Sequence, residues 1–315
     1  MNRTEIINAL SQDDFSSFYK EADKIKRENF SDIINIRAIL EFSNYCSRKC
    51  IYCGLNACNN NIKRFRMTAE EIVSSSLLAY ECGYKTIVLQ SGEDSFFTTE
   101  ILSQIVTEIK KCGIAVTLSC GERDDYRALR KSGADRYLIK HETADRKIYE
   151  YLHPNSSFDN RIKCLKELKS LGFETGSGFM IGLPKQTLET IADDILLLKE
   201  IGCDMAGIGP FIPHPDTKLS RQKKGDTELT KKAVALSRIV MPKINLPATT
   251  ALGVINERAK NDIFSCGANV IMKKITPTKY KHLYEIYPSQ MTDTDILKDR
   301  LLVEKQIKAL GCVPI

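Results

Sequence analysis

The chain has 315 residues, of which 43% are hydrophobic and 27% are charged, a balance that excludes a disordered chain and can form a sizeable core. The 46 Lys and Arg residues against 40 Asp and Glu residues give a net charge of +6, which fits anionic small molecules or acidic partners and does not require nucleic acid. No apolar stretch is long enough to span a membrane and the start of the chain lacks a secretory signal, so we expect a cytoplasmic protein. The 11 cysteines are an odd number and mostly lie singly in apolar segments, which argues against a secreted disulfide framework.

After an N-terminal helical stretch, β-like runs alternate regularly with helical segments as far as residue 274. The helical segments carry apolar residues at intervals of three and four, as in residues 69–82 and 187–201, and several end at a glycine. Eight βα units predict the α/β class and a (β/α)8 TIM barrel, with its chemistry at the carboxyl ends of the strands. The predicted strands span residues 36–44, 85–92, 115–121, 135–142, 174–182, 203–211, 246–253 and 269–274.

We divide the chain into three parts on this pattern. Residues 1–34 are predicted to form an N-terminal helical extension and residues 35–275 the barrel. Residues 276–315 are predicted to form a tail that closes one end of the barrel, with several tyrosines followed by a charged helix over residues 294–310. No repeat, low-complexity tract or linker interrupts the chain.

A CxxxCxxC run follows the first predicted strand and consists of Cys46, Cys50 and Cys53. Three thiolates on one short loop bind three irons of a [4Fe–4S] cluster and leave the fourth iron open to a chelating cofactor, which favours catalysis over simple electron transfer. The alternative is a zinc site or an inert structural role. A zinc site requires a fourth ligand, and Cys58 is the one close candidate. The spacing, the position after the first strand and the aromatic Tyr52 together favour the cluster.

With Tyr52 directly before the third cysteine, the run resembles the signature of the radical S-adenosylmethionine (SAM) superfamily. The resemblance implies that SAM chelates the open iron, that the reduced cluster donates an electron to the sulfonium, and that a 5′-deoxyadenosyl radical then attacks the substrate. Residues 91–94 (SGED) stand where the superfamily carries a GGE-like motif for the methionine amino group, although a solvated turn is the alternative.

Two further residues at predicted strand or helix ends fit a SAM site. Glu142 is expected to accept hydrogen bonds from the ribose, with pairing to Lys140 or helix capping as the alternative. Arg161 is expected to hold the methionine carboxylate, unless it is a solvated residue on a surface helix.

A closer resemblance, over about residues 34–288, is to the HydE family of [FeFe]-hydrogenase maturases. Biotin synthase and methylornithine synthase share the barrel and the cysteine loop, but GIGPFIPHPDT together with PATTA is more similar to HydE. The resemblance implies SAM-dependent radical processing of an iron carbonyl cyanide cysteine complex, supplied by a partner maturase, toward the diiron subsite of the hydrogenase. The segments that carry it include LEFSNYCSRKCIYCGL, VLQSGED, GADRYLIKHETAD, ETGSGFMIGLPKQT and CGANVIMKKITPTKYKHLY.

Carried over position by position, the family's contacts fall on two sets of residues. The SAM contacts are Tyr52, Gln90, Ser91, Ser119, Glu142, Arg161 and Met205. The substrate contacts are Thr117, Arg136, Thr249, Thr250, Met272, Tyr284 and Tyr287. Each of the second set has a structural alternative: the threonines suit a strand, Met272 and the tyrosines suit core or lid packing, and Arg136 suits a solvent-facing position. His141 and His214 are left unassigned.

The chain departs from the family in two places, and rival functions stay open. The tail offers only Cys312 for a second cluster, so we expect one cluster, and Lys140 stands where an Arg is expected.

The rival functions are a radical SAM mutase or sulfur-inserting enzyme acting on a small amino acid or carboxylate, and an electron-transfer or scaffold protein that merely carries a cluster. The expected partners are the small organometallic substrate, the other hydrogenase maturases and a reductant such as ferredoxin or flavodoxin, with neither nucleic acid nor membrane.

Overall fold

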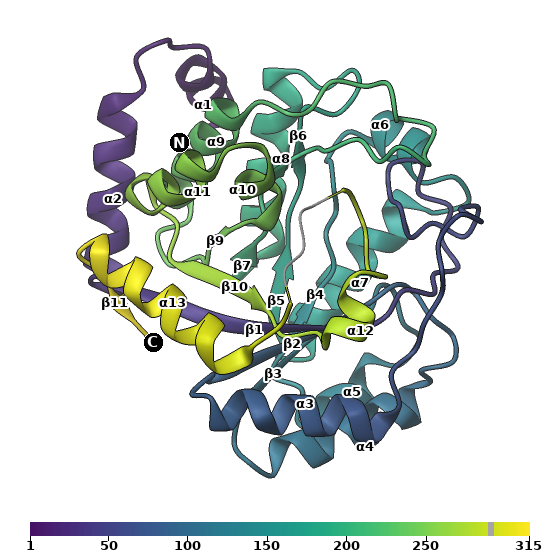
Figure 1. Ribbon diagram of the computed structural model, residues 1–315. Coiled ribbons are helices and arrows are strands. Elements are labelled where there is room, and N and C mark those ends of the chain that lie inside the picture. Colours follow the sequence, from purple (N-terminus) through teal and green to yellow (C-terminus); the bar gives the residue numbers. More distant parts are fainter. Residues whose placement is uncertain (289–292) are drawn as a thin grey trace.

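The computed structural model describes residues 1–288 and 293–315, and its centre is a barrel of eight parallel strands (Figure 1). The hydrogen-bonded order is β7-β5-β4-β3-β2-β1-β10-β9. A parallel bridge between Met205 in β7 and Asn245, just before β9, joins the two ends of this path. The strands are β1 (Ile33–Ser43), β2 (Thr86–Ser91), β3 (Ala115–Ser119), β4 (Arg136–Leu138), β5 (Glu174–Ser177), β7 (Met205–Ala206), β9 (Pro247–Ala248) and β10 (Val270–Lys274). The predicted barrel is therefore confirmed.

Four of the predicted strands end four or five residues earlier in the structure than the sequence pattern indicates, the first being the run over residues 135–142, where β4 ends at Leu138. The runs over residues 174–182 and 203–211 each break into two pieces, and their second halves pair separately as β6 (Met180–Ile181) and β8 (Gly209–Pro210). The predicted strand over residues 246–253 is wrong beyond Ala248, because residues 250–255 form a short helix, α10 (Thr250–Ile255). Thr249 keeps an extended backbone as its N-cap, and an Ala-Leu pair follows, which favours a helical turn over a β-strand.

The helices that cover the barrel begin and end at residues with suitable chemistry. Thr68 and Thr187 each close a capping box at the start of their helices, and Gly202 adopts a left-handed conformation (φ 71°) that ends α8 without the penalty a Cβ would add. The covering helices are α3 (Ala69–Glu81), α4 (Thr99–Lys110), α5 (Tyr126–Lys131), α6 (Arg146–Leu152), α7 (Phe158–Ser170), α8 (Leu188–Ile201), α9 (Thr227–Val240), α10, α11 (Glu257–Asp262) and the 3-10 turn η1 (Ile263–Cys266). In the described part of the chain, no helix has both the length and the apolar character needed to cross a lipid bilayer.

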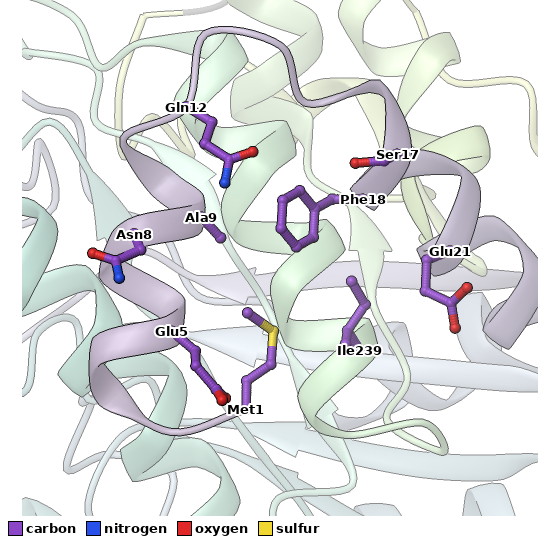
Figure 2. Close-up of a pocket in the computed structure, with 9 residues that line it drawn as sticks. All are labelled: Met1, Glu5, Asn8, Ala9, Gln12, Ser17, Phe18, Glu21 and Ile239. Carbon is purple, nitrogen blue, oxygen red and sulfur yellow. The ribbon is translucent and has the colours of Figure 1, made fainter.

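Two N-terminal helices, α1 (Arg3–Leu10) and α2 (Ser16–Phe30), pack on the outside of the barrel against α8 and α9. They leave a hollow of about 640 Å³ between them and α9, in which Met1, Phe18 and Ile239 form an apolar floor (Figure 2). Glu5 and Glu21 lie at its edge. This hollow lies among the outer helices and shares no residue with the barrel cavity described below.

The C-terminal tail forms hydrogen bonds near both ends of β1. Near its beginning, α12 (Thr278–Lys281) is followed by Leu283, whose carbonyl accepts a hydrogen bond of 2.6 Å from the side chain of Asn44 beyond the end of β1. Near its end, α13 (Ile296–Ala309) leads into β11 (Val313–Pro314), which pairs in parallel with Ile33 and Ile34 at the start of β1 (Figure 1). Residues 289–292 of the tail lie outside the described residues, and the division at residues 34 and 275 stays a prediction.

A fully buried arginine ties α9 to the segment that enters β10. The guanidinium of Arg238 donates to the carbonyl oxygens of Gly267 (3.0 Å) and Pro242 (2.8 Å) and to Oδ1 of Asn269 (3.1 Å). No carboxylate is paired with it among the described residues, and burial lowers its pKa to about 10. The hydrogen bonds to these three acceptors are what offsets the cost of burying the charge.

We expect Arg238→Met to lower the free energy of unfolding by roughly 3 kcal/mol, because the carbonyls of Gly267 and Pro242 lose their guanidinium donor and Oδ1 of Asn269 keeps only the N–H of Leu246. Urea unfolding followed by circular dichroism measures the change. The matched control is Arg221→Met at an exposed position, which should alter stability by less than about 0.5 kcal/mol. Equal stability of the two variants would contradict a structural role for the buried guanidinium.

Candidate active site

A cavity of about 370 Å³ opens at the carboxyl ends of the barrel strands. The cysteine loop, the ends of several strands and the beginning of the C-terminal tail all contribute to its lining. Most of the residues singled out from the sequence meet here: Cys46, Cys50, Tyr52, Cys53, Gln90, Ser91, Ser119, Glu142, Arg161, Met205, Thr249, Thr250, Met272, Tyr284 and Tyr287. Thr117 and Arg136 do not line it.

The cysteine loop is held against the end of β2. The backbone N–H of Ser47 donates to the carbonyl of Glu93 (3.0 Å), and the backbone N–H of Glu93 points to Sγ of Cys46 (3.4 Å). A Cβ added at Gly92 would stand 2.7 Å from the Cβ of Cys46 and clash with the carbonyl of Tyr45, so only glycine permits this approach. The contact fixes the first cysteine relative to the strand that carries Gln90 and Ser91.

All three loop cysteines are partly buried. Burial raises the pKa of Cys46, raises that of Cys50 to about 12 and raises that of Cys53 well above its usual value. The thiols therefore stay protonated at neutral pH until a metal displaces their protons. Within residues 1–288 and 293–315, no three His, Cys, Asp or Glu side chains converge on one point that holds a single metal ion.

Arg161 belongs to a chain of charges at the cavity wall. Its Nε lies 2.7 Å from Oε1 of Glu122, and Oε2 of Glu122 lies 2.9 Å from Arg48. Burial opposes ionisation of Glu122, but Arg161 and Arg48 outweigh it and hold the pKa of this carboxyl below its usual range. Arg48 also pairs with Glu93. The solvated-surface alternative for Arg161 is wrong, because its side chain is only 10% exposed and faces the cavity.

Glu142 lies where the chain leaves β4 and turns toward β5. Its backbone is in the left-handed region (φ 64°) and is fixed by hydrogen bonds from its N–H to Gly178 (2.9 Å) and to its carbonyl from Met180 (3.1 Å). Its carboxylate pairs with Lys140 at 2.9 Å. Burial opposes ionisation, but Lys140 lowers the pKa, so the group is a carboxylate that faces the cavity. The pair with Lys140 and a contact to a ligand are thus compatible.

His153 is a cavity residue that sequence reasoning missed. Its Nε2 lies 3.1 Å from the hydroxyl of Tyr52, and its Nδ1 lies 2.8 Å from the carbonyl of Tyr149. Burial lowers the pKa of His153 to about 4, so the ring is neutral. Nδ1 must then donate to the carbonyl and Nε2 must accept from Tyr52, which fixes the tautomer. The histidine at the end of α6 carries no motif that would have identified it.

The two histidines left unassigned lie outside the cavity lining. His141 is buried behind it, with Nδ1 2.9 Å from the hydroxyl of Ser177 and Nε2 3.4 Å from Asp194. His214 packs so closely on Gly54 that a Cβ there would stand 2.5 Å from its ring. Both histidines therefore support backbone near the cavity rather than its surface.

Two expected substrate contacts lie below the cavity. Arg136 is at the start of β4 and binds Glu174, at the start of β5, with 2.5 Å between Nε and Oε2; it also donates to Thr86 (3.3 Å). The expected substrate contact of Arg136 is therefore corrected: this end of the strand is opposite to the one that carries the cavity, and a carboxylate already pairs with it. Thr117 is buried on β3, and its hydroxyl has no hydrogen-bond partner among the described residues.

Three further inward-facing residues escaped sequence reasoning. Arg37 is buried in the barrel below the cavity and donates to Sδ of Met205 at 3.1 Å. Burial and the nearby Arg136 lower its pKa to about 10. Glu41 and Lys274 line the cavity beside the tail and pair at 2.7 Å. Strand alternation identifies all three as inward-facing only when the register of β1 and β10 is known.

Comparisons with known proteins agree with this architecture. The model of the radical SAM superfamily matches residues 40–198. The chain is 51% identical, over 95% of its length and 86% of the relative's, to the [FeFe] hydrogenase maturase subunit HydE of Thermotoga maritima. Among solved structures, methylornithine synthase (PylB) superposes with a TM-score of 0.88 at 23% identity, over all of this chain and 94% of that one. HydG, a maturase of the [FeFe]-hydrogenase, superposes with a TM-score of 0.83 at 20% identity, over all of this chain and 72% of that one. At these identities the two structures show the shared fold alone.

Proposed function

Because the chain belongs to the radical SAM superfamily and, within it, to the family of the [FeFe]-hydrogenase maturase HydE, we propose that it is the radical SAM enzyme that processes an iron carbonyl cyanide cysteine complex during assembly of the hydrogenase H-cluster. The family uses a [4Fe–4S] cluster and SAM. The observation that carries the proposal is that the cysteines, the expected SAM contacts and the polar residues beyond them line one continuous cavity. We further propose the cytoplasm as its location, and the other maturases and a ferredoxin or flavodoxin as its partners.

In this proposal Cys46, Cys50 and Cys53 each bind one iron and leave the fourth iron to SAM. The presence of all three cysteines in the cavity lining and the close packing of Gly92 on the loop support it, because together they place the thiols at one shared space. When bound, the cluster supplies an electron and SAM supplies the radical chemistry. The protein's own contribution is to bind, orient and shield the reactants.

Replacing Cys46, Cys50 and Cys53 together by Ala should abolish the cluster in anaerobically reconstituted protein, because no other described thiol stands in the cavity lining. Iron and sulfide analysis with electron paramagnetic resonance measures the loss. Cys58→Ala is the matched control on the same loop: Cys58 is exposed, and its loss should leave about four irons per chain. Retention of iron and sulfide in the triple variant would disprove this ligand set.

We propose that the charged and polar residues at the cluster end of the cavity hold SAM. Arg161 is oriented by Glu122 and donates to the methionine carboxylate, while the Glu142 carboxylate accepts from the ribose hydroxyls. Tyr52, Gln90, Ser91, Ser119 and Met205 complete this part of the lining. The neutral His153 holds the Tyr52 hydroxyl and with it the ring beside the third cysteine.

Arg161→Ala should weaken SAM binding by about 1.5–3 kcal/mol, because a buried charge-assisted hydrogen bond to the carboxylate is lost. Equilibrium dialysis with the reconstituted enzyme measures the affinity. Arg146→Ala serves as control, since this arginine pairs with Asp159 on the protein surface and should not affect SAM. An affinity that is the same in both variants would remove Arg161 from the SAM site.

The substrate is proposed to lie among Thr249, Thr250, Met272, Tyr284 and Tyr287. The hydroxyl of Thr249 is buried and has no hydrogen-bond partner in the described part of the chain, so it is available to a ligand. Burial raises the pKa of both tyrosines, which keeps their phenols protonated as donors. Donors of this kind suit the cyanide and carboxylate groups of an anionic iron complex.

The proposed function predicts that purified, reduced enzyme consumes a synthetic iron carbonyl cyanide cysteine complex together with SAM and yields an adenosylated product, as detected by mass spectrometry. Thr249→Val should lower the rate of consumption about tenfold, because one donor is lost. Thr107→Val on the outer face of α4 is the control and should not change it. If a free amino acid is instead rearranged or thiolated in step with SAM cleavage while the complex is ignored, the enzyme is a mutase or sulfur-inserting enzyme.

A further inference from the structure

Glu41 and Lys274 form an ion pair on the cavity wall where β1 meets β10. Strand pairing places Ile39 opposite Lys274, and Glu41 follows two residues later on the same, inward face of β1. Nζ of Lys274 lies 2.7 Å from Oε1 of Glu41, and both side chains line the cavity. On its other side Glu41 is paired in register with Gln90 of β2, which is one of the proposed SAM contacts. The pair therefore stands in the cavity next to the SAM site.

The carboxylate of Glu41 is held firmly in place. Its side chain is only 2% exposed, and it accepts a hydrogen bond of 3.3 Å from the hydroxyl of Thr276. The backbone N–H of Glu41 donates to the same hydroxyl at 2.9 Å. Burial raises the pKa of Glu41, whereas Lys274 acts to lower it. Such a buried carboxylate costs free energy unless partners compensate it, and Lys274 is one such partner.

Lys274 has donors to spare. An ammonium group has three N–H bonds, and in the described chain Glu41 is the acidic side chain paired with this one. The Lys274 side chain is 24% exposed, and its exposed part lies at the cavity. The neighbouring Lys273 differs, because it pairs with Asp299 at 3.0 Å and lies outside the cavity lining. Although they are adjacent on β10, Lys273 therefore has a structural role and Lys274 faces the cavity.

A carboxylate beside an ammonium is the complement of an α-amino acid, which has an amino donor and a carboxylate acceptor on one carbon. Stability alone gives little reason for such a pair in a cavity wall, since apolar residues of similar size are usually at least as stabilising. We propose that Glu41 and Lys274 form a subsite for the amino acid portion of the substrate, with Glu41 accepting from the α-amino group and Lys274 donating to the α-carboxylate. This inference rests on the proposed function and specifies which part of the iron-bound cysteine the protein recognises.

The subsite determines how the substrate is presented. With its amino and carboxylate groups held at the end of β1, the cysteine side chain and the iron point away from this wall, into the space that also adjoins Gln90. Tyr284 and Tyr287 lie close enough to Glu41 for its charge to raise the pKa of their phenols. Tyr284, Ile286 and Tyr287 of the tail line the same cavity as Glu41 and Lys274, so the tail forms part of the space that the substrate would occupy.

The test compares two synthetic iron carbonyl cyanide complexes, one carrying cysteine and one carrying cysteamine, which lacks the carboxylate. With the wild-type holoenzyme and SAM, the KM for the cysteamine complex should be about tenfold higher, as expected for the loss of one charge-assisted hydrogen bond. Lys274→Met should raise the KM for the cysteine complex by a similar factor and change the KM for the cysteamine complex far less. Lys274→Arg should restore preference for cysteine, and Lys273→Met is the matched control with both constants unchanged.

The possible outcomes distinguish failure of the Glu41–Lys274 subsite from failure of the proposed function. If the wild type consumes the cysteine complex but Lys274→Met raises both KM values equally, or neither, the subsite is wrong and the proposed function stands. If Lys274→Met weakens SAM binding as strongly as it raises the KM, the pair belongs to SAM and the subsite is again wrong. If the wild type consumes neither complex, the proposed function fails and the subsite fails with it. If the wild type has the same KM for both complexes, the carboxylate is not recognised and the subsite is wrong, whether or not Lys274→Met folds.

Discussion

The close contact between the cysteine loop and the end of β2 is the constraint on which the rest of the site depends. Gly92 has no side chain, so the backbone of the loop can lie directly against it, and hydrogen bonds from Gly92 N–H to Ser43 (3.1 Å) and from Ser47 N–H to Glu93 (3.0 Å) hold it there. Because β2 also carries Gln90 and Ser91, the thiols and the neighbouring polar groups are placed by one piece of backbone. A larger residue at position 92 would move the cysteines relative to the entire cavity.

The charges at this end of the cavity extend the same constraint outward. Glu93 binds Arg48, Arg48 binds Glu122, and Glu122 binds Arg161, so each charge has a partner of opposite sign. Such a chain orients an arginine more precisely than an apolar pocket does, because the planar guanidinium has fixed donor directions. The same chain lets Arg161 stay charged at only 10% exposure. The chain of charges therefore sets both the position of the Arg161 guanidinium and its protonation state.

The sequence was enough to predict the barrel, the cysteine loop and many of the polar residues that line the cavity, because strand ends and the CxxxCxxC spacing are local signals. It failed where the answer depends on pairing between distant residues. Arg136 was assigned to the substrate, but its distance from the cavity follows from the register of β4 against Glu174 in β5, which no local pattern contains. His153 lies in a segment without a motif, and Glu41 and Lys274 lie in segments that resemble the family but are far apart in sequence, so only the closed barrel brings them together at the cavity.

The lower half of the barrel explains why the cavity is confined to its carboxyl end. Arg136 pairs there with Glu174, whose side chain is half exposed to solvent, and the buried Arg37 side chain reaches across the interior to Met205 and occupies the space below the cavity. Long polar side chains are costly in such a position unless they are paired, and Arg37 has only a sulfur atom as its hydrogen-bond partner in the described residues. Its pKa, lowered to about 10, still leaves it charged at neutral pH. Arg37 therefore places a positive charge below the cavity, which favours an anionic complex over a neutral one and agrees with the donors that the threonines and tyrosines supply above it.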